Sequence, residues 1–296
     1  MPPTEPQGAL HGGPLPPDGT LPPGGPLPPG GTPQRAWLDL ALLLCDQADA
    51  ISMRHFRRDL RIETKPDSTF VTQADREIEL AVRASINAAF PDHGIVGEEF
   101  GEERPDAELR WYIDPIDATN NYLRGIPVFA TLIALERQTE VVVGVVSAPA
   151  LATRWYAWSG GGAWAVDRGH DAGPRRLHVS GITRVEDAQL LYSSPSDPAT
   201  NERLPGLAVT LRRAWRERGF GDFWGYALVA EGAAEASFEL GVHSWDLGPM
   251  LLLVEEAGGR LTAFDGTRTI HGRSAIATNG VLHDELLRSL TSRDGA

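Results

Sequence analysis

The sequence is short of cysteine, of positive charge and of long apolar runs. A single cysteine, Cys45, excludes an intramolecular disulfide and a zinc site built from thiolates. Lysine and arginine number 27 against 40 aspartates and glutamates, and the resulting net charge of −13 disfavours nucleic acid as a partner. The apolar stretch at 38–45 is too short to cross a membrane. These absences are compatible with a cytoplasmic protein that binds neither nucleic acid nor membrane.

The first 33 residues differ in composition from the rest of the chain. They hold 12 of the 23 prolines, and the run Gly-Pro-Leu-Pro-Pro occurs twice, at 13–17 and 25–29. Such a segment has too few large apolar residues to bury a core, and it lacks the basic start and apolar region of a signal peptide. We therefore predict a disordered tail over residues 1–33 that is dispensable for chemistry, with a docking role as the alternative.

The remaining chain is long enough for one large domain or for two halves that pack together. Residues 34–180 are predicted to form an N-terminal α+β half, because helical patterns at 35–58 and 72–90 precede short β-like runs separated by turn residues such as 160–162. Residues 181–296 are predicted to form a C-terminal α/β half in which strands and helices alternate. The helices expected there are 204–218, 226–234, 245–257 and 283–290, with an extended stretch at 220–223.

The central stretch, 111–122, reads Trp-Tyr-Ile-Asp-Pro-Ile-Asp-Ala-Thr-Asn-Asn-Tyr. Its first apolar residues predict a short buried strand that ends at Asp114, where Pro115 stops the hydrogen-bond ladder. Asp117 follows beyond the turn, so both carboxylates, with the Ile116 carbonyl, can converge on one point. Oxygen ligands of this kind suit Mg²⁺, Mn²⁺ or Ca²⁺. The simpler interpretation is that both aspartates only shape a turn and cap a helix, and this stretch alone leaves the choice open.

Other polar features accompany this stretch. Ala118 and Thr119 are expected to open a short helix whose free N–H groups bind an anion, and a cation beside an anion site is what hydrolysis of a phosphate ester requires. Three further features are Gly-Glu-Glu at 97–99, Ser-Trp-Asp at 244–246, and a Lys65 loop followed by Val-Thr-Gln-Ala-Asp at 71–75. Each alone has a simple explanation, as exposed loop carboxylates, a first-turn residue that complements the helix dipole, or a capping box.

Together and in this order, the motifs resemble those of the inositol-monophosphatase-like family of Mg²⁺-dependent phosphatases. The family pattern has a lysine loop with Val-Thr-x-x-Asp, then Gly-Glu-Glu, then Asp-Pro-Ile-Asp-Gly-Thr-x-Asn-Phe/Tyr, and a late Trp-Asp before Glu-Ala-Gly-Gly. Here Trp-Asp at 245–246 precedes Glu-Ala-Gly-Gly at 256–259, and the resemblance covers nearly everything after the tail. Stretches such as Tyr-Leu-Arg-Gly-Ile-Pro-Val at 122–128 and Gly-Asp-Phe-Trp-Gly-Tyr-Ala at 221–227 are most similar to bacterial histidinol-phosphatases.

The resemblance implies a layered α-β-α-β-α fold, in the α+β and α/β classes, and a metal-dependent phosphomonoesterase. The implied ligands of two or three Mg²⁺ ions, with Mn²⁺ as a substitute, are Glu98, Asp114, the Ile116 carbonyl, Asp117 and Asp246. The implied catalytic residues are Thr119, with Glu98 and Asp75 behind it, which place the attacking water, and Lys65, which supplies charge near metal or phosphate. The implied substrate contacts are the Ala118 and Thr119 amides, Asp246, Glu239 and Asp222.

One residue departs from the family pattern. Ala118 stands where the motif has glycine, and alanine there is strained by about 1–2 kcal/mol if φ is positive. The reaction expected from the resemblance is hydrolysis of L-histidinol phosphate to L-histidinol and phosphate, a step of histidine biosynthesis. The alternatives are an inositol phosphate or another sugar phosphate as substrate and, from a different class, a weakened metal-binding regulatory protein. The oligomeric state is left open, a homodimer included.

Overall fold

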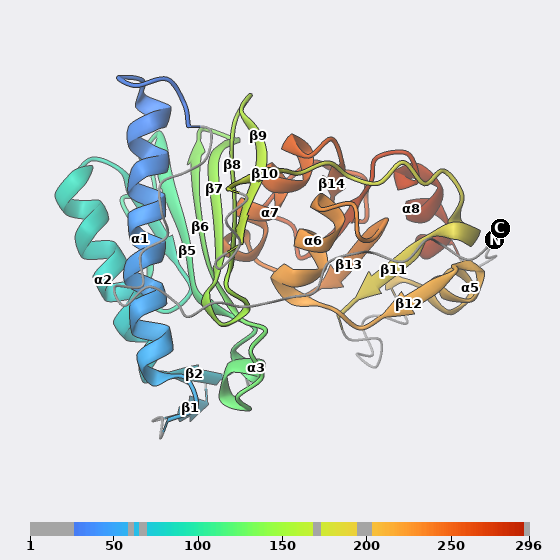
Figure 1. Cartoon of the computed structure of the whole chain (residues 1–296), viewed down its shortest axis with the longest axis horizontal. Helices are drawn as coiled ribbons and strands as arrows, with labels where there is room; N and C mark the ends of the chain where they lie inside the picture. The colour runs from blue at the N-terminus through green and yellow to red at the C-terminus, as the bar shows by residue number, and fades with distance from the viewer. Residues whose placement is uncertain (1–26, 59–61, 65–69, 168–172, 194–202, 293–296) are drawn as a thin grey trace.

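The computed structural model describes residues 27–58, 62–64, 70–167, 173–193 and 203–292, which are arranged in five layers (Figure 1). From one end to the other, the layers are a helix pair, an eight-stranded sheet, a second helix pair, a five-stranded sheet and a third helix pair. This arrangement confirms the predicted α-β-α-β-α fold. The division into two halves near residue 180 stays a prediction.

The first layer consists of α1 and α2, which cover one face of the large sheet. The bounds are Pro33–His55 for α1 and Gln73–Ala89 for α2, close to the predicted ranges. Side chains of both helices share one buried apolar cluster with Trp111 and Ile113 of the sheet. The capping box expected at the start of α2 is present, since Thr72 and Asp75 exchange hydrogen bonds.

The last residues of the predicted N-terminal tail, 27–33, lie within the described part of the chain. Leu27, inside the predicted tail, packs against the apolar cluster under α1, and Pro33 is already the first helical residue. Composition is averaged over a stretch of residues. It therefore does not detect that the last few residues of the stretch lead into a helix or pack beside it. Residues 1–26 lie outside the described part of the chain, and the disorder expected for them stays a prediction.

Eight strands form the second layer in the order β10-β9-β8-β7-β6-β5-β3-β4. β3 and β5 run parallel, and the other neighbours run antiparallel. The glycine run at 160–162 is the expected turn between β8 and β9, and the Gly160 and Gly162 N–H groups donate to the Glu256 carboxylate at 2.6 and 2.7 Å.

The strand bounds of the large sheet are β3 Gly94–Gly97, β4 Gly101–Glu103, β5 Leu109–Asp117, β6 Ala130–Arg137, β7 Glu140–Ala148, β8 Thr153–Trp158, β9 Gly162–Asp167 and β10 Arg175–Arg176. A separate antiparallel pair consists of β1 (Ile62–Thr64) and β2 (Phe70–Thr72).

The central strand extends further than predicted. β5 continues through Pro115 to Asp117 instead of ending at Asp114. Its register with β6 shifts between these two aspartates, so the proline lies in a bulge, where the ladder is interrupted and a missing N–H is tolerated. The Thr131 hydroxyl of β6 donates to the Pro115 carbonyl at 2.7 Å. The two carboxylates are therefore separated by a bulge in a strand, and the turn comes afterwards, at the start of α3 (Thr119–Leu123).

The remaining layers contain the second helix pair, the smaller sheet and the last helix pair. The smaller sheet has the order β12-β11-β13-β15-β14 and combines parallel and antiparallel neighbours. The strand bounds are β11 Gln189–Tyr192, β12 Arg216–Arg218, β13 Ala236–Leu240, β14 Arg260–Thr262 and β15 Ser274–Thr278. The helix bounds are α6 Asp222–Ala230 and α7 Ser244–Glu256 between the sheets, and α5 Leu207–Arg213 and α8 His283–Thr291 on the far side.

Two predicted elements of this part are wrong. The helix expected at 204–218 ends at Arg213, because residues 216–218 join the edge of the smaller sheet and pair in parallel with β11. Pairing with a strand that is distant in sequence stabilises this segment as a strand more than its local pattern stabilises it as a helix. The extended stretch expected at 220–223 is instead the start of α6, whose first residue, Asp222, has a φ of +57°.

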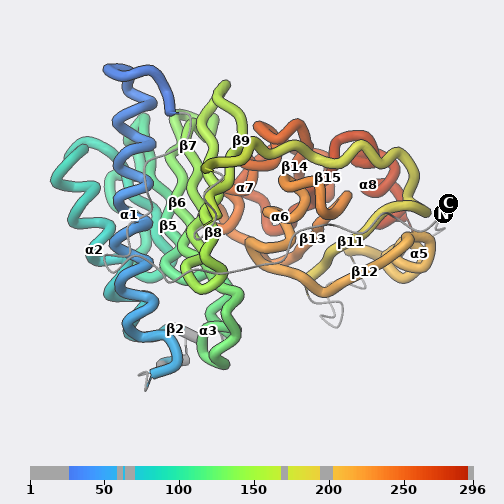
Figure 2. Tube along the Cα trace, viewed as in Figure 1, coloured from blue at the N-terminus to red at the C-terminus, as the bar shows by residue number. Residues whose placement is uncertain are grey.

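α7 lies directly on the large sheet, as Figure 2 shows by its place between β8 and β14. Two glycines permit this approach: a Cβ on Gly144 would lie 2.9 Å from Pro249 Cα, and a Cβ on Gly248 would lie 2.9 Å from Ala134 Cβ. Tyr112 of β5 shares a buried cluster with α7, so Asp114, two residues further on, points toward the same helix. Among the residues that the structure describes, no helix has the length and apolar character needed to cross a membrane.

Candidate active site

Three aspartates meet where the end of β5 faces the start of α7. Asp114 and Asp117 come from the two sides of the bulge, and Asp246 is the third residue of α7. Each offers a carboxylate oxygen, and these three oxygens lie within 4.8 Å of one another. Ionised carboxylates this close repel each other unless a proton or a cation lies between them. The fold thus unites the predicted pair with an aspartate about half the chain away.

Asp114 is the most deeply buried of the three. Its side chain is 3% exposed, and its Oδ1 atom has no hydrogen-bond partner among the described residues. Burial, followed by the charges on Glu98, Asp117 and Asp246, raises the pKa of Asp114 well above its ordinary value. A buried carboxylate oxygen without a partner is costly, and a cation would satisfy it. The all-oxygen donor set fits a hard divalent cation.

Backbone N–H groups orient the other two aspartates. The Phe223 N–H at the start of α6 donates to Asp117 Oδ2 at 2.8 Å, and the His243 N–H donates to Asp246 Oδ2 at 2.8 Å. Burial, followed by the charges on Asp222 and Asp246, raises the pKa of Asp117, while the bond from Phe223 acts in the opposite direction. Both carboxylates are therefore held by backbone N–H groups at the start of α6 and just before the start of α7, the helices of the second helix pair.

Glu98 and Asp75 lie near Asp114, on the side of α2. Their charges are among the causes that raise the pKa of Asp114. Asp75 is fully buried, and burial, with the Glu98 charge, raises its pKa to about 6 in spite of hydrogen bonds from Thr72. Asp75 Oδ1, like Asp114 Oδ1, has no hydrogen-bond partner among the described residues. The two residues thus extend the acidic cluster toward the first helix layer.

The turn after β5 carries the residues expected to hold phosphate. Thr119 begins α3, and its hydroxyl donates to the Ile116 carbonyl at 2.9 Å. Ala118 adopts φ +64° and ψ +46°, the left-handed conformation that glycine adopts without strain. Of the two conformations that the sequence left open, the structure has the strained one, at a cost of about 1–2 kcal/mol.

A pocket opens beside the three aspartates, on the side of the smaller sheet. Asp222, Tyr226 and Glu239 line it together with Asp117 and Asp246. Burial, followed by the Asp222 charge, raises the pKa of Glu239 to about 8, and burial with the Asp246 charge raises that of Asp222 to about 6. A cationic group in this pocket would favour the ionised form of both carboxylates.

Of the predicted site residues, the structure brings Asp114, Asp117 and Asp246 together and places Asp222 and Glu239 in the adjoining pocket, while the roles of all predicted site residues stay predictions. Lys65 lies outside the described residues. Sequence reasoning missed the Phe223 and His243 amides and the Tyr226 side chain. Backbone donors have no residue-type signal. Tyr226 follows Asp222 by about one helical turn, so a helix predicted four residues earlier would have placed both on one face.

The chain matches the inositol monophosphatase family over residues 34–294. It is 48% identical over 259 residues to a histidinol-phosphatase from Mycobacterium tuberculosis, which covers 86% of this chain and 98% of that protein. It is 34% identical over 240 residues to an inositol-1-monophosphatase from Mesorhizobium japonicum, with 79% and 87% covered. Among solved structures, the extragenic suppressor protein suhB from Bartonella henselae superposes with a TM-score of 0.78 at 30% identity, over 87% of this chain and 99% of that one.

Five alternating layers and a carboxylate cluster at a strand end define a phosphoric monoester hydrolase of a metal-dependent class. The chain belongs to the inositol monophosphatase family. The acidic cluster is therefore the candidate active site of a phosphatase that acts on small phosphate monoesters.

Proposed function

We propose that this protein hydrolyses L-histidinol phosphate to L-histidinol and phosphate with Mg²⁺ as its cofactor. The pocket is the observation that carries this proposal, because Asp222 and Glu239 add two carboxylates beyond the three-aspartate cluster. Histidinol phosphate has an ammonium group close to its phosphoryl end, whereas an inositol phosphate offers hydroxyl groups around its ring. An acidic pocket complements the ammonium through charge-assisted hydrogen bonds. Identity of 48% with a histidinol-phosphatase, against 34% with an inositol-1-monophosphatase, supports the same substrate.

The metal ligands of this proposal are the three aspartates, with Glu98 and the Ile116 carbonyl completing the set for two or three ions. Bound Mg²⁺, or Mn²⁺ in its place, would supply a water of lowered pKa and neutralise charge on the phosphate. The donor residues fit this role, since one buried Asp114 oxygen has no hydrogen-bond partner within the described part of the chain and all donors are oxygens. Without bound cations, an anionic substrate would meet a cluster of like charges.

The other residues bind and orient. Thr119, with Glu98 and Asp75 behind it, is proposed to place the attacking water, and the hydrogen bond from Thr119 Oγ1 to the Ile116 carbonyl fixes that hydroxyl. Asp75, with a pKa of about 6, can take up a proton near neutral pH. The Ala118 and Thr119 amides are proposed to hold phosphate oxygens, and Lys65 to add positive charge. Such an enzyme would serve histidine biosynthesis in the cytoplasm, as a monomer or a homodimer.

Phosphate release from histidinol phosphate, inositol 1-phosphate and p-nitrophenyl phosphate, measured side by side with Mg²⁺, tests the proposal. We expect kcat/KM for histidinol phosphate to exceed that for the inositol ester by about tenfold or more, because the pocket carboxylates pair only with the ammonium. Excess EDTA should abolish all three activities. A preference for the inositol ester would replace the proposed substrate, and full turnover in EDTA would overturn the metal-dependent chemistry.

A further inference from the structure

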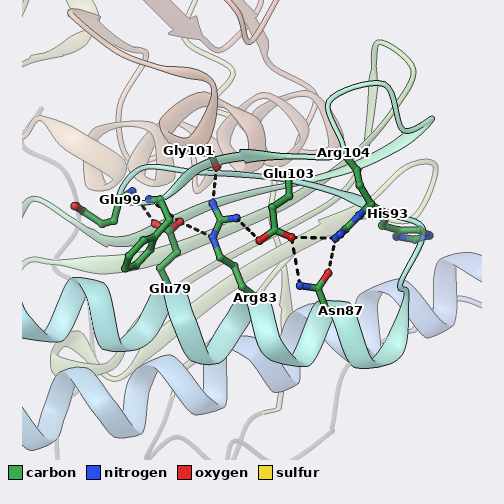
Figure 3. A network of polar contacts seen from close by, with 9 residues as sticks. Glu79, Arg83, Asn87, His93, Glu99, Gly101, Glu103 and Arg104 are labelled. Atoms are coloured by element: carbon green, nitrogen blue, oxygen red, sulfur yellow. Dashed lines mark hydrogen bonds and ion pairs between the residues drawn. The ribbon is translucent and has the colours of Figure 1, made fainter.

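α2 carries a polar stripe of which the proposed chemistry uses only the first residue. Asp75, Glu79, Arg83 and Asn87 follow one another at four-residue spacing and therefore lie along one side of the helix. The last three belong to the network in Figure 3, which connects α2 with the segment after β3. Glu79 is completely buried, and Arg83 is 5% exposed. Charged side chains buried this deeply need fixed partners.

Glu79 binds the backbone of the loop that carries Glu98. Its carboxylate accepts the Glu99 N–H at 2.7 Å and the Phe100 N–H at 3.1 Å, from the two residues directly after Glu98 (Figure 3). The Glu98 N–H itself donates to the Ile113 carbonyl of β5 at 3.2 Å. The backbone around Glu98 is therefore held by α2 on one side and by β5 on the other.

Arg83 fixes Glu79 and the far end of the same loop. Its Nε donates to Glu79 Oε1 at 2.8 Å, Nη1 lies 3.2 Å from Glu103 Oε1, and Nη2 donates to the Gly101 carbonyl. Gly97 leaves space for the Glu79 carboxylate, because a Cβ at residue 97 would lie 2.0 Å from Glu79 Oε1. A carboxylate that accepts two amides and a guanidinium has little orientational freedom.

We propose that Glu79, held by Arg83, is a positioning residue for Glu98 in the metal site, an inference that rests on the proposed metal-dependent function. Glu79 accepts hydrogen bonds from backbone N–H groups of the loop, so it acts through the placement of the loop and not on the reacting atoms. Groups that orient metal ligands in this way typically affect metal affinity by about 10–100-fold when removed. Loss of Glu79 should therefore weaken Mg²⁺ binding and leave substrate binding at saturating Mg²⁺ unchanged.

Calorimetric titration of the metal-free protein with Mg²⁺, without substrate, tests the proposal. Glu79→Gln should weaken Mg²⁺ affinity by about tenfold or more, because an amide cannot accept from two N–H groups and a guanidinium with its NH₂ side. The matched control is Glu77→Gln on the same helix, whose carboxylate pairs with Arg54 and His55 instead. The control should bind Mg²⁺ as the wild type does. Arg83→Lys, which keeps the charge but not the reach to Gly101, should show a smaller loss and serves if Glu79→Gln does not fold.

Two further readouts separate positioning from a purely structural role. Hydrogen exchange at the Glu99 and Phe100 amides should be faster in metal-free Glu79→Gln than in Glu77→Gln. At saturating Mg²⁺, KM for substrate should stay within about twofold of the wild type. Wild-type Mg²⁺ affinity in both Glu79→Gln and Arg83→Lys would overturn the proposal, as would a loss of thermal stability alone. If the wild type itself bound no Mg²⁺, the proposed metal-dependent function would fail, and this inference with it.

Discussion

The acids on the two sides of the site differ in their surroundings. On the side of the large sheet, Asp114 and Asp117 crowd together with Asp246, with oxygens within 4.8 Å, and one Asp114 oxygen has no partner among the described residues. On the side of the smaller sheet, Asp222 and Glu239 line a pocket. Burial is the first cause of the raised pKa values on both sides. The first side groups carboxylate oxygens closely enough to share a cation, whereas the second adds two carboxylates to the pocket that Asp117 and Asp246 also line.

Asp114→Asn should break the large-sheet side and should have the largest effect. It removes one buried charge and little volume, so the protein should fold while kcat/KM falls by about a thousandfold or more on every substrate, since the metals supply several kcal/mol of charge stabilisation. Phosphate release measures the loss, and circular dichroism measures the fold. Substantial turnover by this variant would mean that Asp114 is not a metal ligand.

Glu239→Gln and Asp222→Asn should affect the small-sheet side selectively. A charge-assisted hydrogen bond contributes about 1.5–3 kcal/mol, so each change should raise KM for histidinol phosphate by about 10–100-fold. Asparagine tolerates the +57° φ of Asp222, so this substitution should keep the backbone of α6 in place. Hydrolysis of p-nitrophenyl phosphate, which has no ammonium, should change far less. Equal losses on both substrates would assign these acids to the metal side.

The pH dependence of stability should separate the two sides in the metal-free protein. The folded-state pKa of Glu239 is raised from 4.5 to about 8, so the folded state holds a proton that the unfolded chain has released over this range. Stability should therefore fall as pH rises from about 5 to 8. The Glu239→Gln side chain cannot ionise, so this variant should lose less stability than the wild type as pH approaches 8. The expected difference between the two proteins in the change of thermal midpoint is about 2–4 °C. Thermal midpoints in EDTA check this, and parallel slopes for both proteins would contradict it.

Ala118→Gly should have the smallest effect, at the turn after β5 that we propose to hold phosphate. Glycine relieves left-handed strain but adds freedom to the unfolded chain, so stability should rise by about 1 kcal/mol or less. Ala152→Gly is the matched control, since Ala152 also has a positive φ, +56°, at the end of the short helical turn between β7 and β8, and it is not among the proposed site residues. Both variants should raise the thermal midpoint, and only Ala118→Gly should change activity, modestly upward. A severe loss of activity without unfolding would mean that the Ala118 methyl group is needed.

The sequence by itself determined most element types and the local part of the site. Helical spacing defined α1 and α2, and the Thr72–Asp75 spacing predicted a capping box that is present. The pair Asp114 and Asp117 also follows from three-residue spacing at the end of an apolar run. Features of this kind depend on residues within one or two turns of each other, so they survive whatever the rest of the chain does. The order of the layers and the wider ligand set came from the resemblance in motifs and not from spacing.

The tertiary structure decided what depends on partners far away in the chain. Pairing with β6 extends β5 past Pro115. Pairing with β11 places residues 216–218 in a sheet although their local pattern is helical. The approach of α7 to the large sheet, through Gly144 and Gly248, places Asp246 beside the β5 aspartates. Glu79 is a charged helix residue that becomes buried because the loop after β3 covers it. Each of these outcomes is a balance between local preference and the burial or hydrogen bonds that a distant segment supplies. That segment lies nearby only in the folded chain.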